Sequence, residues 1–143
     1  MPVLLSLLFG SRWRIWRLAA AGTMYLTILV AGSIPGARAE IGHYASGVVL
    51  HSLAYAILAA LCFSAVGGTP GQRAAKAVLV VAAMGAGDEF VQSFFPYRGA
   101  SVHDWAVDCM AAALACSLLS LLPRPILALI DSTGEHSRPS SGL

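Results

Sequence analysis

Four apolar segments decide what this chain can fold into. They cover residues 18–34, 47–66, 77–93 and 104–122, and each is close to the length of about 20 residues that a helix needs to cross a bilayer. With 57% hydrophobic residues and a mean hydropathy of +0.73, the chain is too apolar for a soluble fold. We therefore expect an all-α membrane protein, a bundle of about four transmembrane helices.

Small residues in the third apolar segment predict where two helices approach closely. Residues 82, 83, 86 and 87 are alanine or glycine, which gives small pairs at 82/86 and 83/87. Pairs at this spacing let a second helix backbone come near in a membrane. We expect a tight helix contact along these two ridges.

Positively charged residues predict which side of the membrane each end of the chain occupies. Lysine and arginine collect in the cytoplasmic loops of membrane proteins. With four alternating spans, only Arg38 and Arg98 fall on the outer side, so both termini are expected in the cytoplasm. The residues on the inner side are Arg12, Arg14, Arg17, Arg73, Lys76, Arg124 and Arg138.

The segments that flank and connect the spans differ in composition. Residues 1–17 end in alternating arginine and tryptophan, which is typical of a cytoplasmic or interfacial anchor among lipid headgroups. Residues 67–76 are rich in turn-forming residues and predict a cytoplasmic loop. Residues 123–143 are rich in Ser, Gly and Pro and predict a disordered cytoplasmic tail, to which we assign no function.

The first apolar segment has a second interpretation, as a cleaved signal peptide. It follows arginines and precedes Ala37-Arg38-Ala39, which matches a small-residue cleavage site. Its apolar run, residues 18–34, is longer than the 7–15 residues or so of a signal core, so we favour a retained helix. Both interpretations place the next loop outside.

Several classes of function are disfavoured by composition and motifs. A net charge of +2 gives no support to nucleic-acid binding. Cys62, Cys109 and Cys116 lie inside apolar segments without metal-ligand spacing, so we expect buried small residues, no metal and no cofactor. The chain has no HExxH, GxSxG or phosphate-loop motif, which leaves open whether it is an enzyme.

Acidic residues gather in one stretch, residues 88–108, which holds four of the seven in the chain. Alternating spans bring this stretch to the same membrane surface as the start of the second span. A charge left unpaired near a bilayer costs several kcal/mol by order of magnitude, so this gathering points to a site. The candidate cluster consists of His51, Asp88, Glu89, Gln92, Arg98, Asp104 and Asp108.

Helical spacing predicts how these side chains are directed. Residues four apart share a face, which groups Asp88 with Gln92, Asp104 with Asp108, and His51 with Tyr55. Asp88 and Glu89 are adjacent and diverge by about 100°. We expect one of the two to face the bundle and the other to face the headgroups or the loop.

Two interpretations of the cluster stay open. In the structural one, Arg98 pairs with an acid to fix the outer loop, Ser101 or Asp104 caps the fourth helix, and Asp108 bonds a neighbouring helix. In the functional one, an outward-facing pocket binds a polar or phosphate-bearing headgroup, with Arg98 as the anion contact and the acids as base, acid or cation ligands. A proton-linked transporter fits less well, because the acids lie at one surface and not at mid-depth.

The stretch resembles the signature of the VanZ-like family of small bacterial membrane proteins. Residues 88–92 read DEFVQ and match its Asp-Glu-x-x-Gln, residues 96–98 match its Pro-x-Arg, and Asp104 matches the acid that follows. His51 and Tyr55 match its His-x-x-x-Tyr. Two departures are Gly47-Val48, where members commonly carry Asp-Lys, and Asp108, where they carry Asn.

The resemblance covers roughly residues 30–122 and implies a multi-pass bundle of about four helices in the bacterial inner membrane. The name-giving member is associated with resistance to teicoplanin, a lipidated glycopeptide, and the molecular activity of the family is unassigned. The implied function is a cell-envelope protein with a lipid-linked or lipidated ligand at its outer face. The alternative is a membrane-embedded enzyme that acts on a lipid-linked or phosphate-bearing substrate.

Overall fold

The computed structural model describes residues 10–36 and 46–122, and these residues form an all-helical bundle without strands. A short 3-10 helix, η1 (Ser11–Trp13), leads into α2 (Arg14–Ser33). The other helices are α4 (Gly47–Ala65), α5 (Pro70–Gln92) and α6 (Val102–Ser120). The predicted cleavage site at 37–39, most of the N-terminal anchor and the predicted tail at 123–143 lie outside the described residues.

Among the described helices, α2, α4 and α6 are long and apolar enough to cross a membrane. This finding confirms the coarse prediction of a helical membrane protein. α5 is the longest of the four described helices, but its composition is less apolar. It carries Arg73 and Lys76 near its start and Asp88 and Glu89 near its end.

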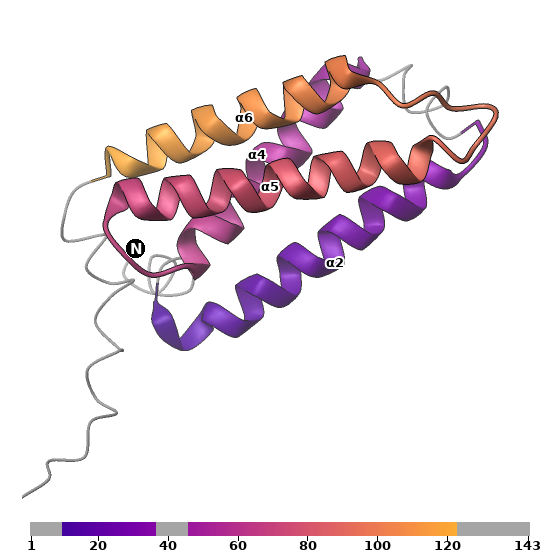
Figure 1. Ribbon diagram of the computed structural model, residues 1–143. Coiled ribbons are helices and arrows are strands. Elements are labelled where there is room, and N and C mark those ends of the chain that lie inside the picture. The colour runs from indigo at the N-terminus through magenta and orange to yellow at the C-terminus, as the bar shows by residue number, and fades with distance from the viewer. Residues whose placement is uncertain (1–9, 37–45, 123–143) are drawn as a thin grey trace, which may run out of the picture.

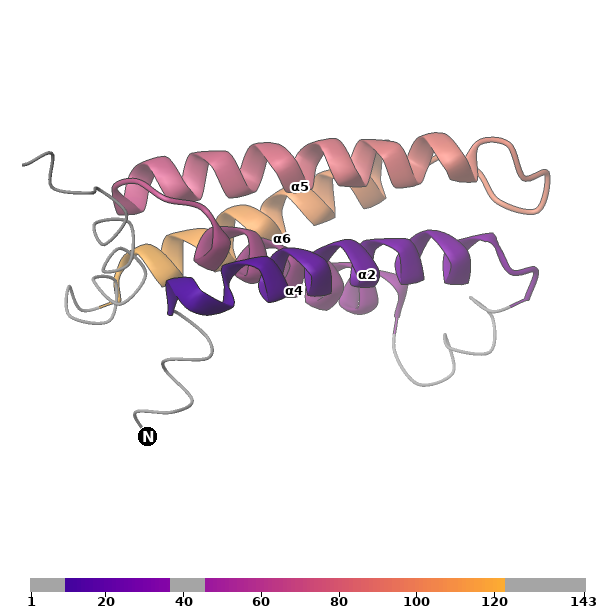
Figure 2. The same cartoon turned by 90° about the horizontal axis from the view of Figure 1, so that it is seen from below.

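The helices are arranged so that the described chain starts and stops at one end of the bundle. In Figure 1 the α4–α5 turn, η1 and the end of α6 lie at that end, which we call the terminal end (Gly10, residues 66–69 and Leu122). The end of α2 and the α5–α6 connection lie at the opposite end, which we call the loop end (residues 93–101). Figure 2 shows the same separation from below.

α4 is the central helix and contacts α2, α5 and α6. In Figure 1 it crosses behind α5. Its side chains Tyr55, Leu58, Ala59 and Phe63 are all 0% exposed. Helices in a membrane associate through close van der Waals packing, so this closely packed face fixes the position of α4. The buried residues that pack with it include Ala77 and Val81 of α5 and Ala112 and Cys116 of α6.

The outer surface of the bundle is also apolar. On α6, Met110, Leu114 and Leu118 follow one another at four-residue spacing and are 71%, 64% and 60% exposed. Large contiguous apolar patches are rare on soluble monomers. This ridge is suited to contact with lipid tails.

α5 begins at Pro70, seven residues before the start of the predicted third span at residue 77. The prediction of a loop over residues 67–76 is therefore wrong for residues 70–76. Thr69 and Gln72 form a capping box, in which each side chain bonds the backbone N–H of the other residue. Pro at the first helical position supports the same start. The Thr-x-x-Gln pattern was the sequence signal for this boundary.

Arg17 is buried, which corrects its prediction as a headgroup anchor. Its guanidinium donates to the carbonyl of Ser64 at 2.8 Å and to the carbonyl of Gly10 at 2.7 Å, and the residue is only 6% exposed. Ser64 lies in the last turn of α4, where carbonyls have no partner within the helix. Arg17 therefore joins the start of α2 to the end of α4, while Arg12 and Arg14 are exposed.

Two glycines allow close helix contacts of α5. A Cβ added at Gly85 would lie 3.1 Å from Asp108 Oδ2, and one at Gly87 would lie 2.6 Å from the Tyr25 hydroxyl. Ala83 and Ala86 are exposed. Gly87 belongs to the predicted pair 83/87 and makes a close contact as expected, and Gly85, which belongs to neither predicted pair, makes a second one.

Replacing Arg17 by leucine should destabilise the fold. The Arg17→Leu variant leaves the buried Ser64 carbonyl without its donor, and we expect the free energy of unfolding to fall by about 1–3 kcal/mol. Titration of the detergent-solubilised protein with dodecyl sulfate measures this change. Arg14→Leu, at an exposed position, is the matched control and should change the value by less than about 0.5 kcal/mol. Equal losses in both variants would contradict the assignment.

Candidate functional site

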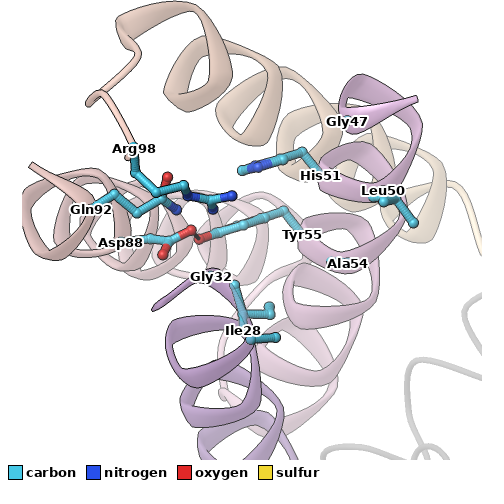
Figure 3. A pocket seen from close by; sticks show the side chains of 11 residues that line it. Ile28, Gly32, Gly47, Leu50, His51, Ala54, Tyr55, Asp88, Gln92 and Arg98 are labelled. Atoms are coloured by element: carbon cyan, nitrogen blue, oxygen red, sulfur yellow. Dashed lines mark hydrogen bonds between the residues drawn. The ribbon is translucent and has the colours of Figure 1, made fainter. Parts of the chain in front are cut away.

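A cavity of about 230 Å³ lies among α2, α4, α5 and the α5–α6 loop, near the loop end of the bundle. Figure 3 shows that its polar side chains converge on one space from several different elements. α2 and α4 provide apolar walls, and the polar groups come from α4, α5 and the loop. The lining residues are Ile28, Ala31, Gly32, Gly47, Leu50, His51, Ala54, Tyr55, Asp88, Gln92 and Arg98.

Asp88 is almost fully buried in this wall at 1% exposed. One of its oxygens, Oδ2, accepts a hydrogen bond from the Tyr55 hydroxyl at 3.2 Å. The other oxygen, Oδ1, has no hydrogen-bond partner among the described residues. Gln92, one turn further along α5, is also buried and lines the cavity, as the shared-face prediction required. Asp88 therefore offers an unused acceptor at a polar site inside an apolar bundle.

His51 and Asp108 form a pair that joins α4 to α6. The Nδ1 atom of His51 lies 2.9 Å from Oδ1 of Asp108, whose side chain is fully buried. The imidazole also stacks parallel to the Tyr55 ring, with centroids 6.0 Å apart. The prediction that Asp108 bonds a neighbouring helix is confirmed. Asp108 does not line the cavity itself but holds a residue that does.

Glu89 points away from Asp88, as predicted, and faces the α5–α6 loop. Its Oε2 accepts a short hydrogen bond from the backbone N–H of Ser101. The Ser101 hydroxyl in turn accepts from the N–H of Asp104 at 3.1 Å and caps α6. Of the two predicted caps, Ser101 is therefore the one observed. Glu89 and Asp104 are buried but do not line the cavity, so the predicted cluster is split in two.

Arg98 reaches into the cavity from the loop, and Gly32 gives it room. A Cβ added at Gly32 would lie 3.3 Å from Nη2 of Arg98, 3.5 Å from Nε2 of Gln92 and 3.7 Å from Oδ1 of Asp88. The Nε atom of Arg98 is buried without a hydrogen-bond partner in the described chain. The described chain also has no ion pair between Arg98 and an acidic side chain, although the sequence predicted one. The Arg98 guanidinium therefore has a donor, Nε, that the described residues do not use.

Gly32 was missed by sequence reasoning, as were the apolar residues Ile28, Leu50 and Ala54. A glycine within an apolar helix has many explanations, and only the fold shows three polar heads meeting at it. The sequence does show that Ile28 and Gly32, four residues apart, lie on one face of the first helix. Nothing in that pattern indicated which helix the face would meet.

Within residues 10–36 and 46–122, no group of three or more His, Cys, Asp or Glu side chains is arranged to hold a metal ion. Asp88 and Asp108 are divided between two bonding networks, through Tyr55 and His51 respectively. Cys62 and Cys116 are buried free thiols, as predicted, and Cys109 is half-buried.

Comparisons with known proteins do not add a relative. No family model, curated protein or solved structure matches the chain.

Removing the Tyr55 hydroxyl should destabilise the protein more than removing an exposed one. Tyr55→Phe takes away the donor to a buried carboxylate, and we expect the free energy of unfolding to fall by about 1–3 kcal/mol. Tyr97→Phe is the matched control, because the Tyr97 hydroxyl donates to the Ser33 carbonyl at an exposed position. Its loss should stay below about 0.5 kcal/mol. Unfolding titrations in the same detergent compare the two, and a larger effect for Tyr97→Phe would refute this ranking.

Proposed function

We propose that this chain is a VanZ-like membrane protein whose cavity binds the headgroup of a lipid or lipidated ligand. The observation that carries the proposal is the Arg98 guanidinium, which sits at the cavity with a buried, unpartnered Nε. A buried donor without a partner costs about 1–3 kcal/mol. A ligand oxyanion would bond the guanidinium from the cavity side, where Arg98 is partly exposed. Phosphate and carboxylate groups match the planar fork of arginine.

The polar groups around Arg98 narrow the class of headgroup. The unpartnered Oδ1 of Asp88 faces the same space near Gly32, so a donor and an acceptor are both available there. A simple anion would satisfy Arg98 and leave Asp88 without a donor. A headgroup that carries both an anion and a hydroxyl or ammonium group would satisfy both.

The size and walls of the cavity favour an amphiphile. At about 230 Å³ it is smaller than the usual range of roughly 300–1,000 Å³ for sites that enclose a whole small molecule. It therefore has room for a headgroup and not for a long chain. Ile28 and Ala31 of α2 and Leu50 and Ala54 of α4 provide an apolar surface beside the polar groups, along which an acyl or prenyl chain would pack.

We further propose that all four helices cross the bacterial inner membrane, with both termini in the cytoplasm and the loop end outside. α5 has 23 residues and would span about 34 Å, more than the roughly 30 Å of hydrocarbon. Its charged residues lie near its two ends, and Arg73 and Asp88 are buried against other helices. A location at the outer face would suit a lipidated glycopeptide of the teicoplanin type as well as a lipid.

Reporter fusions test this topology. Alkaline phosphatase joined after Gly99 should be active, because it would be exported, and the same enzyme joined after Leu143 should be inactive. A fluorescent protein that matures only in the cytoplasm should show the reverse pattern. Activity of alkaline phosphatase at the C-terminus would refute the four-span arrangement.

Native mass spectrometry of the protein, released gently from its membrane, tests the binding proposal. Wild type should carry a discrete lipid or lipid-linked adduct, and Arg98→Ala should lose it by tenfold or more, since hydrogen bonds to charged groups contribute about 1.5–3 kcal/mol. Arg98→Lys keeps the charge but not the fork and should bind weakly. Arg14→Ala, at the terminal end, is the matched control. Equal amounts of ordinary phospholipid on wild type and Arg98→Ala would favour the structural interpretation.

The alternative function is a membrane-embedded enzyme that acts on a lipid-linked or phosphate-bearing substrate. The specific observation in its favour is the His51–Asp108 pair, because His51 lines the same cavity as Arg98. An imidazole held by a buried carboxylate beside an anion contact is an arrangement that hydrolytic enzymes use.

A further inference from the structure

We infer that the cavity hydrolyses a phosphate ester or anhydride on a lipid, with His51 as general base, Asp108 as its positioning residue and Arg98 as the contact to the phosphate. This inference rests on the proposed function, because it requires that a phosphate-bearing headgroup binds at Arg98. It goes further by assigning a reaction and a role to each of the three residues.

The hydrogen bond to Asp108 leaves one nitrogen of His51 available for chemistry. A neutral imidazole has one donor and one acceptor nitrogen, and a carboxylate only accepts. In the neutral imidazole, Nδ1 would therefore carry the proton that bonds Asp108, which leaves the lone pair on Nε2. No described residue forms a hydrogen bond with Nε2. Figure 3 shows the imidazole directed into the cavity, toward the space that the Arg98 guanidinium also enters.

The imidazole is held from two directions, which a general base requires. Asp108 is 0% exposed and lies against Gly85, where an added Cβ would be 3.1 Å from its Oδ2. The stacked Tyr55 ring limits rotation of the imidazole, and Tyr55 is itself bonded to Asp88. The His51 side chain is 15% exposed and lines the cavity, so a ligand there can contact it.

The nucleophile in this reaction is water. Among the described residues that line the cavity there is no serine, threonine or cysteine, and the Tyr55 hydroxyl donates to Asp88. A covalent intermediate on a side-chain hydroxyl or thiol therefore has no candidate among the lining residues. Water next to Nε2 of His51 would be positioned for attack on a phosphorus atom held by Arg98.

The step balances with water as the only co-reactant. As the water oxygen forms its bond to phosphorus, one water proton moves to Nε2 of His51. The bond from phosphorus to the bridging oxygen breaks, and its electron pair stays on that oxygen, which then takes the proton from His51. Arg98 stabilises the negative charge on the non-bridging oxygens throughout. The products are a free phosphate and a lipid shortened by that phosphate.

The test measures binding and phosphate release by the purified full-length protein in detergent micelles. The two probes are a dioleoyl phosphatidic acid and a long-chain polyprenyl diphosphate, which separate a phospholipid source from a polyprenyl source. We expect wild type to release inorganic phosphate from one of them. His51→Gln should lower kcat by at least about 100-fold and leave the Kd for that probe within threefold. Asp108→Asn should lower kcat with little change in KM, as expected of a positioning residue.

His103→Gln is the matched control, since His103 is exposed, lies outside the cavity and should keep full activity. If wild type binds a probe but releases no phosphate, the catalytic inference is overturned and the binding function stands. If it binds neither probe, the catalytic inference fails, and native mass spectrometry of wild type and Arg98→Ala decides the binding proposal separately. Release that persists in folded His51→Gln would overturn the role of His51. Phosphate release by wild type is enough to decide whether the cavity is catalytic. A variant that fails to fold therefore does not prevent the test.

Discussion

The burial of two carboxylates inside an apolar bundle is the constraint on which the rest of this structure depends. Asp88 on α5 and Asp108 on α6 are 1% and 0% exposed, and neither position is tolerable without a polar partner. Both partners come from α4, where Tyr55 and His51 lie one turn apart. One short segment of α4 therefore fixes its rotation and depth against α5 and α6 together. The apolar face of α4 continues the same packing toward the terminal end.

The two ends of the bundle use charged side chains differently. At the terminal end, Arg17 donates to the Ser64 carbonyl, and Arg73 and Lys76 donate to carbonyls of the α4–α5 turn. These contacts complete the ends of helices, and they are structural. At the loop end, Asp88 and Arg98 each keep a buried polar atom without a partner in the described chain. Asp88 and Arg98 both line the cavity, and this position distinguishes the candidate site from the contacts that complete helix ends.

Much of this arrangement could be predicted from local patterns. Apolar segment lengths gave all four long helices, and four-residue spacing placed Asp88 with Gln92 and His51 with Tyr55. The start of α5 was predicted too late, because the basic residues Arg73 and Lys76 resemble a loop although Thr69 and Gln72 specify a cap. Arg17 is a similar case, since the sequence shows its charge but not the carbonyls of α4.

The fold divides the predicted cluster, because only His51, Asp88, Gln92 and Arg98 of its members line the cavity. Glu89 and Asp104 belong to the loop and the start of α6, and only the path of residues 93–101 decides this. Gly32 enters the site because α2 happens to cross α5 at that turn. Contacts between helices far apart in sequence are not encoded in any single spacing, which is why sequence patterns located the polar groups but not the wall opposite them.

Few residues of α2 are buried, and this affects how a ligand can enter the cavity. Of its 20 residues only Arg17 and Ala21 are buried, both in the half near the terminal end. Toward the loop end, α2 is attached by the Tyr25 bond to the Met84 carbonyl and by the Tyr97 bond to the Ser33 carbonyl. Its cavity-facing residues Ile28 and Gly32 lie between those two attachments. If residues 28–32 of α2 moved slightly away from the other helices, the cavity would open laterally to the bilayer. A headgroup could then enter the cavity while its tail stayed in the lipid.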